Sequence, residues 1–172
     1  MPGGQERALR RRINSVQSTK QITRAMELIA ATRVVKAMTR ANAARPYSTK
    51  MTGVIEDLAA GGVGIDDPLL RSSETVSSIG FVVITSDRGL AGAYNSSVIR
   101  AAEKEIMAAQ TEGKEYKLVL VGKKAADYFR FRNYQIEAAF SGMTDTPSYE
   151  DARDVATTCL LYTSDAADES DR

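Results

Sequence analysis

A seven-residue repeat of apolar or small side chains runs through the first 58 residues of the chain. Every seventh residue from Leu9 to Leu58 is apolar, small or threonine. A repeat of this period keeps one stripe of a helix facing one direction, and it is typical of a helix that winds around a second helix. Over about fifty residues such a helix is roughly 75 Å long. The stripe consists of Leu9, Val16, Thr23, Ala30, Ala37, Ala44, Met51 and Leu58.

No later segment of the 172-residue sequence is long enough to pair with this helix. We therefore expect its partner to be another chain or a segment outside this sequence, and its function to be mechanical or concerned with assembly. Pro46 removes one backbone hydrogen bond, so the sequence predicts a kink there. Because the repeat resumes in register at Met51, we expect the helix to continue to about Leu58.

Charge is distributed unevenly along the chain. Residues 1–50 contain eleven Lys and Arg and two acidic residues, a net charge of +9, whereas the whole chain carries +1. The remaining 122 residues therefore carry −8. A basic helix favours an anionic partner, which can be nucleic acid, lipid headgroups or acidic protein loops. A solvated helix face is the simpler alternative.

Composition narrows the kinds of site that the chain can hold. It has no histidine, the commonest general base and metal ligand. The single cysteine, Cys159, excludes an intramolecular disulfide and a thiolate zinc cluster, and fits a reducing compartment. The sequence shows no signal peptide, and no run approaches the ~18 apolar residues of a membrane span. We therefore expect a soluble or peripheral protein without a cofactor or metal.

The region 79–158 alternates strand-like and helix-like segments, which predicts a parallel sheet with right-handed crossovers. Its first two strands are continuous apolar runs, so both faces of each are expected to be buried. Ser148 and Asp151 fit a capping box at the start of the last helix. The predicted strands are 79–85, 117–121 and 134–140, and the predicted helices are about 95–109, 122–132 and the segment after Pro147.

Two stretches could be taken for phosphate-binding loops. The turn ITSDRGLAGAYN at 84–95 follows a strand, precedes a helix and carries two glycines, so it could present backbone N–H groups to a phosphate. It lacks the G-x-G-x-x-G pattern, and we favour a tight strand-to-helix connection. VGKK at 121–124 fails the P-loop pattern, because Lys117 stands where the first glycine belongs and Lys124 where Ser or Thr belongs.

Asp87 and Arg88 follow the first predicted strand, where the active sites of α/β proteins often lie. No second carboxylate or nucleophile accompanies them, so a structural or interface role is expected. A nucleic-acid-binding helix on an α/β body is an alternative function, and a small-molecule enzyme using the 86–95 turn is a third. In nucleic-acid-binding helices the basic region is usually separate from the apolar repeat. Here the two overlap, which favours a helix packed on protein that offers arginines to acidic loops.

Four segments of the chain resemble the gamma subunit of ATP synthase. RRINSVQSTKQITRAMELIAATRVVKA at 11–37 closely resembles that family's N-terminal helix, and ARPYS at 44–48 matches the place where the helix enters its lower half. ITSDRGLAGAYN at 84–95 and VGKKAADYF at 121–129 resemble the first and second strand and turn of the family's α/β domain. The resemblance covers residues from about 5 to about 158.

The resemblance implies a non-catalytic rotor shaft of a proton-translocating ATP synthase. In that family the N-terminal and C-terminal helices form an antiparallel coiled coil inside a ring of catalytic and non-catalytic head subunits. The α/β domain lies near the membrane rotor ring. The epsilon subunit is a further implied partner and nucleic acid is not, and the implied location is the cytoplasmic face of the bacterial plasma membrane. The residues expected to contact partners are Arg10, Lys20, Arg24, Met26, Arg33 and Arg88.

The fold predicted for the chain is α/β, with a long N-terminal coiled-coil helix, a Rossmann-like parallel α/β domain and the C-terminal coiled-coil helix missing. The last fourteen residues, CLLYTSDAADESDR, do not resemble the family. We expect them to be a non-native end produced by a truncated or mis-assembled reading frame. The expected domains are 1–58 (helix), 59–78 (linker), 79–158 (α/β domain) and 159–172 (non-native tail).

Overall fold

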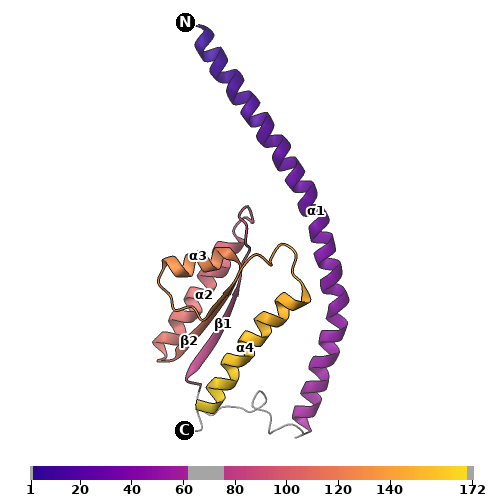
Figure 1. Cartoon of the computed structure of the whole chain (residues 1–172), viewed down its shortest axis with the longest axis vertical. Coiled ribbons are helices and arrows are strands. Elements are labelled where there is room, and N and C mark those ends of the chain that lie inside the picture. Colours follow the sequence, from indigo (N-terminus) through magenta and orange to yellow (C-terminus); the bar gives the residue numbers. More distant parts are fainter. Residues whose placement is uncertain (1, 62–75, 170–172) are drawn as a thin grey trace. The chain divides into compact units, whose positions relative to one another are not determined.

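The computed structural model describes residues 2–61 and 76–169, and the chain divides into two compact units, Met1–Val63 and Gly64–Arg172. The first unit holds one long helix and the second a parallel sheet with helices on it, each unit being considered by itself (Figure 1). The predicted α/β class with a long N-terminal helix is confirmed. The predicted linker, residues 59–78, lies mostly outside the described residues. The elements are α1 Pro2–Ala60, β1 Ser78–Ile84, α2 Tyr94–Thr111, β2 Glu115–Val121, α3 Lys123–Phe131, β3 Ala138–Phe140 and α4 Tyr149–Glu169.

The helix α1 is 59 residues long and continues through Pro46. At about 1.5 Å per residue, its length is roughly 88 Å. Pro2 lies in the first turn, where a missing backbone N–H breaks no helical hydrogen bond. Pro46 removes one internal hydrogen bond, but the helix persists to Ala60. The predicted continuation of the helix beyond Pro46 is therefore confirmed.

The sheet has three parallel strands in the order β1-β2-β3. β1 pairs with β2 along its whole length, from Ser78 opposite Glu115 to Ile84 opposite Val121. The helices α2 and α3 lie on one face of the sheet, and α4 lies on the other (Figure 1). The right-handed βαβ crossover explains why two successive connections cover the same face.

The core of the second unit lies between the sheet and the pair α2 and α3. Fully buried side chains from all these elements meet there, with Phe129 of α3 at its centre in edge-to-face contact with Tyr134. Burying such apolar side chains is the main stabilisation of the unit, at about 1.5–3 kcal/mol for each large one. The buried members of this core are Val83, Ile99, Ile106, Leu118, Leu120, Ala125, Ala126 and Phe129.

The opposite face of the sheet is only partly covered. Val119 and Val121 of β2 are buried, but Val82 and Ile84 of β1 are 47% and 54% exposed. The prediction that β1 is buried on both faces is therefore wrong for the described residues. An apolar run indicates that a strand can be buried. It does not indicate whether other segments pack on both of its faces.

β3 is shorter than the predicted strand at 134–140. Asn133 follows Arg132, the C-cap of α3, and has a positive φ of 57°, which asparagine tolerates better than most residues. The N–H of Tyr134 then donates to the Phe129 carbonyl, so residues after α3 continue the helix end rather than the sheet. The apolar character of Tyr134 and Ile136 reflects packing against the core.

The start of α4 has the predicted capping box. The Asp151 carboxylate accepts hydrogen bonds from the N–H and the hydroxyl of Ser148, and the Asp151 N–H donates to the Ser148 hydroxyl. α4 then runs to Glu169 without interruption at residue 158. The separate origin expected for residues 159–172 stays a prediction, because a continuous helix is compatible with either origin.

Candidate functional site

The apolar stripe predicted from the repeat lies along α1, where its side chains are exposed. Leu9 and Val16 near the amino end are 60% and 61% exposed, and Met51 and Leu58 near the other end are 42% and 46% exposed. Neighbouring apolar side chains such as Ile22 widen the stripe and are also exposed. A helix of this length with so much apolar surface in water is marginal by itself, because most helix stability comes from packing.

The middle of the stripe consists of small residues. Thr23, Ala30, Ala37 and Ala44 present only short side chains over three successive repeats. Small side chains permit the axis of a neighbouring helix to come close, whereas a Leu at the same position holds it away. The geometry of α1 therefore suits a closely packed partner helix.

Five of the six residues expected to contact partners lie on α1, and all five are exposed. Arg10 forms an ion pair of 2.7 Å with Glu6, and Arg24 one of 2.8 Å with Glu27. Both pairs lie in water, so each is worth about 1 kcal/mol or less, and either arginine can exchange its carboxylate for another. Lys20, Met26 and Arg33 stand three or four residues from stripe positions, which places them beside the stripe.

The carboxyl end of β1 holds the main polar cluster of the second unit. Three consecutive residues after the strand bind the first three N–H groups of α3. Lys123 N–H donates to the Asp87 carboxylate at 2.9 Å, Lys124 N–H to the Ser86 carbonyl at 3.2 Å, and Ala125 N–H to the Thr85 hydroxyl at 2.9 Å. The first three N–H groups of α3, which follow the VGKK segment, therefore already donate to acceptors within the protein. They are not available to bind a phosphate.

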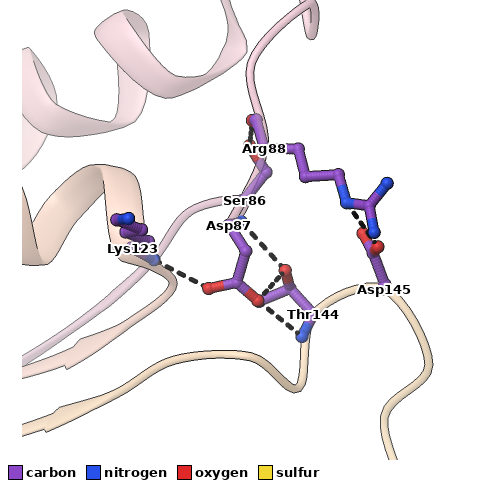
Figure 2. Close-up of polar contacts among 6 residues, drawn as sticks. All are labelled: Ser86, Asp87, Arg88, Lys123, Thr144 and Asp145. Atoms are coloured by element: carbon purple, nitrogen blue, oxygen red, sulfur yellow. Dashed lines mark hydrogen bonds and ion pairs between the residues drawn. The ribbon is translucent and has the colours of Figure 1, made fainter.

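Asp87 also joins β1 to the loop that follows β3 (Figure 2). Its carboxylate accepts the Thr144 hydroxyl at 2.6 Å and the Thr144 N–H at 3.1 Å, while its own N–H donates to the Thr144 hydroxyl oxygen at 2.9 Å. Partial desolvation works to raise the pKa of Asp87. The hydrogen bonds from the Thr144 hydroxyl and from the backbone of Gly142, Lys123 and Thr144 outweigh it and lower the pKa to about 2. An ionised carboxylate so fully used is a structural acceptor rather than a general base.

Arg88 reaches from the same turn to the same loop. Its Nε lies 2.7 Å from Oδ2 of Asp145, and the two side chains are 76% and 30% exposed (Figure 2). Because most of the Arg88 side chain lies in water, this ion pair is worth about 1 kcal/mol or less. Of the residues expected to contact partners, Arg88 is the one that lies outside α1.

Gly122 explains why the two segments can meet. Its φ of 98° is unfavourable for any residue with a side chain, and a Cβ there would lie 2.1 Å from the Thr85 carbonyl oxygen. Lys123, which follows Gly122, stabilises this arrangement through its backbone N–H, which donates to the Asp87 carboxylate. The sequence pointed to Asp87 and Arg88 but not to Thr85, Thr144 or Asp145, since nothing local marks residues whose partners lie 40 or 57 positions away.

The turn at 84–95 is closed by its own side chains. Asn95 accepts the Ser86 N–H at 3.0 Å and donates to the Ser86 hydroxyl at 2.8 Å. The glycine at 92 has φ 57°, as a tight connection requires, and Leu90 has φ 62° and is 88% exposed at the tip. These bonds favour the interpretation as a strand-to-helix connection.

Two further findings concern the described residues as a whole. Within residues 2–61 and 76–169, no helix has the length and apolarity needed to cross a membrane. In the same ranges, no group of three or more cysteine, aspartate or glutamate side chains gathers closely enough to hold a metal ion.

Comparisons with known proteins agree on one family. A family model described as ATP synthase matches residues 5–171. A protein of Frankia casuarinae named ATP synthase gamma chain is 50% identical over 153 residues, which are 89% of this chain and 51% of the relative. Proteins of the same name from Mycolicibacterium gilvum and Salinispora tropica are 43% and 41% identical over 96% and 97% of this chain. The chain spans about half the length of the curated relatives it matches.

Proposed function

The chain belongs to the ATP synthase gamma chain family, and from that premise we propose that it is the N-terminal part of a central rotor shaft in a proton-translocating ATP synthase. In this proposal α1 is one helix of an antiparallel coiled coil. Its partner is the long C-terminal helix of the complete subunit. The shaft turns inside a ring of catalytic and non-catalytic head subunits and has no catalytic site of its own.

The observation that carries the proposal is the exposed stripe on a 59-residue helix. A helix of ordinary length can bury its apolar face on its own domain. One of about 88 Å cannot do so against a unit of this size, and an apolar repeat of seven residues is best covered by another helix. The small residues at the middle of the stripe set a close approach of that second helix.

The basic face of α1 supports the electrostatic part of the proposal. Contacts between a shaft and its ring form and break during each turn, so none can be strong. Exposed ion pairs have the required weakness, at about 1 kcal/mol or less. We propose that acidic loops of the catalytic subunits meet the exposed side chains of α1 in turn. The α1 residues concerned are Arg10, Lys20, Arg24, Met26 and Arg33.

The second unit is proposed to be the foot of the shaft. Its remaining partners would be the epsilon subunit and the membrane rotor ring, with Arg88 as a contact of the foot. The location that follows is peripheral, at the cytoplasmic face of a bacterial plasma membrane. Rotation of the membrane ring would reach the head through this unit and α1.

An assembly experiment tests the proposal with a full-length chimera, in which this chain replaces the matching half of the Frankia casuarinae relative. We expect the chimera to assemble with the head of that relative's ATP synthase and to restore proton-driven ATP synthesis in vesicles. Ala37→Leu should disrupt it, because a larger side chain on the stripe pushes the partner helix away.

The matched control is Ala25→Leu, which lies two residues after stripe residue Thr23 and thus, at about 100° per residue, on the far side of α1. It should assemble normally. A chimera that binds nucleic acid with steep salt dependence and fails to assemble would favour the alternative of a basic nucleic-acid-binding helix. Equal effects of the two variants would show that the stripe does not face a partner helix.

A further inference from the structure

The outer face of α3 carries an exposed aromatic side chain. Phe131 is 83% exposed, whereas Phe129 of the same helix is fully buried in the core. Two residues turn a helix by about 200°, so Phe131 lies opposite the buried face of α3. A single exposed apolar residue is ordinary, and the residues around it decide what this face can bind.

Basic side chains share this face with Phe131. Lys124 and Asp127 precede Phe131 by seven and four residues and so lie in one row with it, and Lys123 and Arg130 lie beside that row. All of them are exposed, and Asp127 is the one acidic residue of α3. The ion pairs among the described residues of the second unit include none of the three cations. The three cations are therefore available to an anion from outside the chain.

This basic face belongs to an acidic part of the chain. Residues 123–132 contain four basic side chains and one acidic side chain, a net charge of +3. Since residues 51–172 carry −8, the other 112 of them carry −11. A local positive surface on a negative unit attracts an anionic partner and turns that side of the unit toward it.

The size of the face indicates which anionic partner suits it. α3 has nine residues and is about 14 Å long, so its outer half presents on the order of 200 Å². A stable protein complex takes about 800 Å² from each partner and needs complementary shapes. A membrane surface has no such requirement, because headgroup phosphates attract Lys and Arg while an aromatic ring enters the boundary with the acyl chains.

We propose that the outer face of α3 binds anionic phospholipids at a membrane surface, with Phe131 inserted between the headgroups. Each basic residue near such a surface strengthens binding by about fivefold, so the three cations contribute about a hundredfold. A contact of this strength is reversible and orients the unit without anchoring it. The inference goes beyond the proposed function, because it requires neither rotation nor a partner for α1.

A single indole can report on this face, because the chain has no tryptophan. The full chain with Phe131→Trp is mixed with vesicles of equal parts phosphatidylcholine and phosphatidylglycerol, whose acyl chains carry bromine as a short-range quencher. Since α1 is basic and attaches the chain to such vesicles by itself, lipid is added until all of the chain is bound, and only the depth of the indole is measured. We expect its emission to shift to the blue and to be quenched.

The matched control is Tyr149→Trp. Tyr149 is 80% exposed, but it lies at the start of α4 beside Glu150 and Asp151. Its indole should stay in water when the chain is bound to the same vesicles, so its emission should be neither shifted nor quenched.

Charge variants test the contribution of the cations. In the Phe131→Trp background, Lys124→Gln combined with Arg130→Gln should lower the ratio of inserted to free indole about thirtyfold. Arg100→Gln combined with Arg153→Gln removes the same charge from exposed positions of α2 and α4 and should change this ratio little. Near-UV circular dichroism of the core tyrosines checks that each variant is folded.

Three results would overturn the inference. They are equal quenching of the two indoles, no quenching of either on fully bound chain, and quenching of Phe131→Trp that survives the loss of Lys124 and Arg130. A single-stranded oligonucleotide that shifts the emission of Phe131→Trp, when vesicles do not, would assign the face to nucleic acid instead. Assembly of the chimera is measured separately, so the proposed function stands after any of these results.

Discussion

Replacing Gly122 by alanine should destabilise the second unit more than any other glycine substitution in its described residues. The new Cβ would lie 2.1 Å from the Thr85 carbonyl oxygen, 2.6 Å from its carbon and 2.8 Å from its Oγ1. Thr85 is 2% exposed and accepts the Ala125 N–H, so it cannot move without disturbing the start of α3. The φ of 98° adds backbone strain.

The size of the effect follows from these two parts. Backbone strain at a positive φ costs about 1–3 kcal/mol, and forcing an extra carbon into a packed site costs about 1–3 kcal/mol more. A loss of about 4 kcal/mol is a large part of the ~5–15 kcal/mol that stabilises a domain of ordinary size. It should lower the urea midpoint of this unit by about 2 M.

Substitutions at two other glycines distinguish the cost of backbone strain from the cost of the steric clash. Gly142 has φ 89° but open space around its Cβ position, so Gly142→Ala should cost only about 1–2 kcal/mol. Gly80 lies in β1 with open space and an ordinary φ, so Gly80→Ala should be neutral or slightly stabilising.

Tyrosine fluorescence and near-UV circular dichroism of the full chain report on this unit, because Tyr116, Tyr128 and Tyr134 pack at its core and the chain has no tryptophan. Far-UV signals would be dominated by α1. If Gly122→Ala and Gly142→Ala unfold at the same urea concentration, the close approach to Thr85 has no energetic consequence and the predicted difference between the two variants is wrong.

The remaining predictions concern Asp87 and the helix α1. Since the folded pKa of Asp87 is about 2, below its ordinary 3.8, its stabilisation is complete above pH 4–5 and is lost as the pH falls toward 2. Between pH 5 and pH 2, the free energy of unfolding measured in urea should fall by about 1–2 kcal/mol more in the unchanged chain than in the Asp87→Asn variant. Equal losses in the two proteins would assign the acid sensitivity to other groups. The isolated chain should self-associate through its stripe, and sedimentation of a monomer at all concentrations would contradict this. In the chimera, one charge reversal on the basic face should be tolerated, whereas reversal of four should slow ATP-driven rotation and lower coupled ATP synthesis; normal values of both would show a merely solvated face. The four are Arg10, Lys20, Arg24 and Arg33.

Periodic features of the sequence predicted the fold well. The seven-residue repeat required a long helix, and its register across Pro46 predicted the continuation to about Leu58 that α1 shows. The alternation of apolar runs and helical segments predicted a parallel sheet. The spacing of Ser148 and Asp151 predicted the start of α4, where the two side chains form the capping box. Each of these signals is local, so the sequence contains it in full.

Features that depend on distant contacts were not predictable in the same way. The exposure of Val82 and Ile84 depends on which segments cover β1, and the short β3 depends on the turn at Asn133. The roles of Thr144 and Asp145 arise only when the loop after β3 meets the β1 turn. A polar residue in a loop gives no sign of which turn it will meet.

The most direct measurement of the proposed role is single-molecule rotation. The chimera is assembled into a surface-fixed head, a bead is attached to its second unit, and ATP is added. We expect continuous rotation in one direction, which stops when ATP is removed and is impaired by Ala37→Leu but not by Ala25→Leu. Hydrolysis of ATP by the same complexes while the bead only fluctuates about one angle would contradict the proposal that this chain forms part of the rotating shaft.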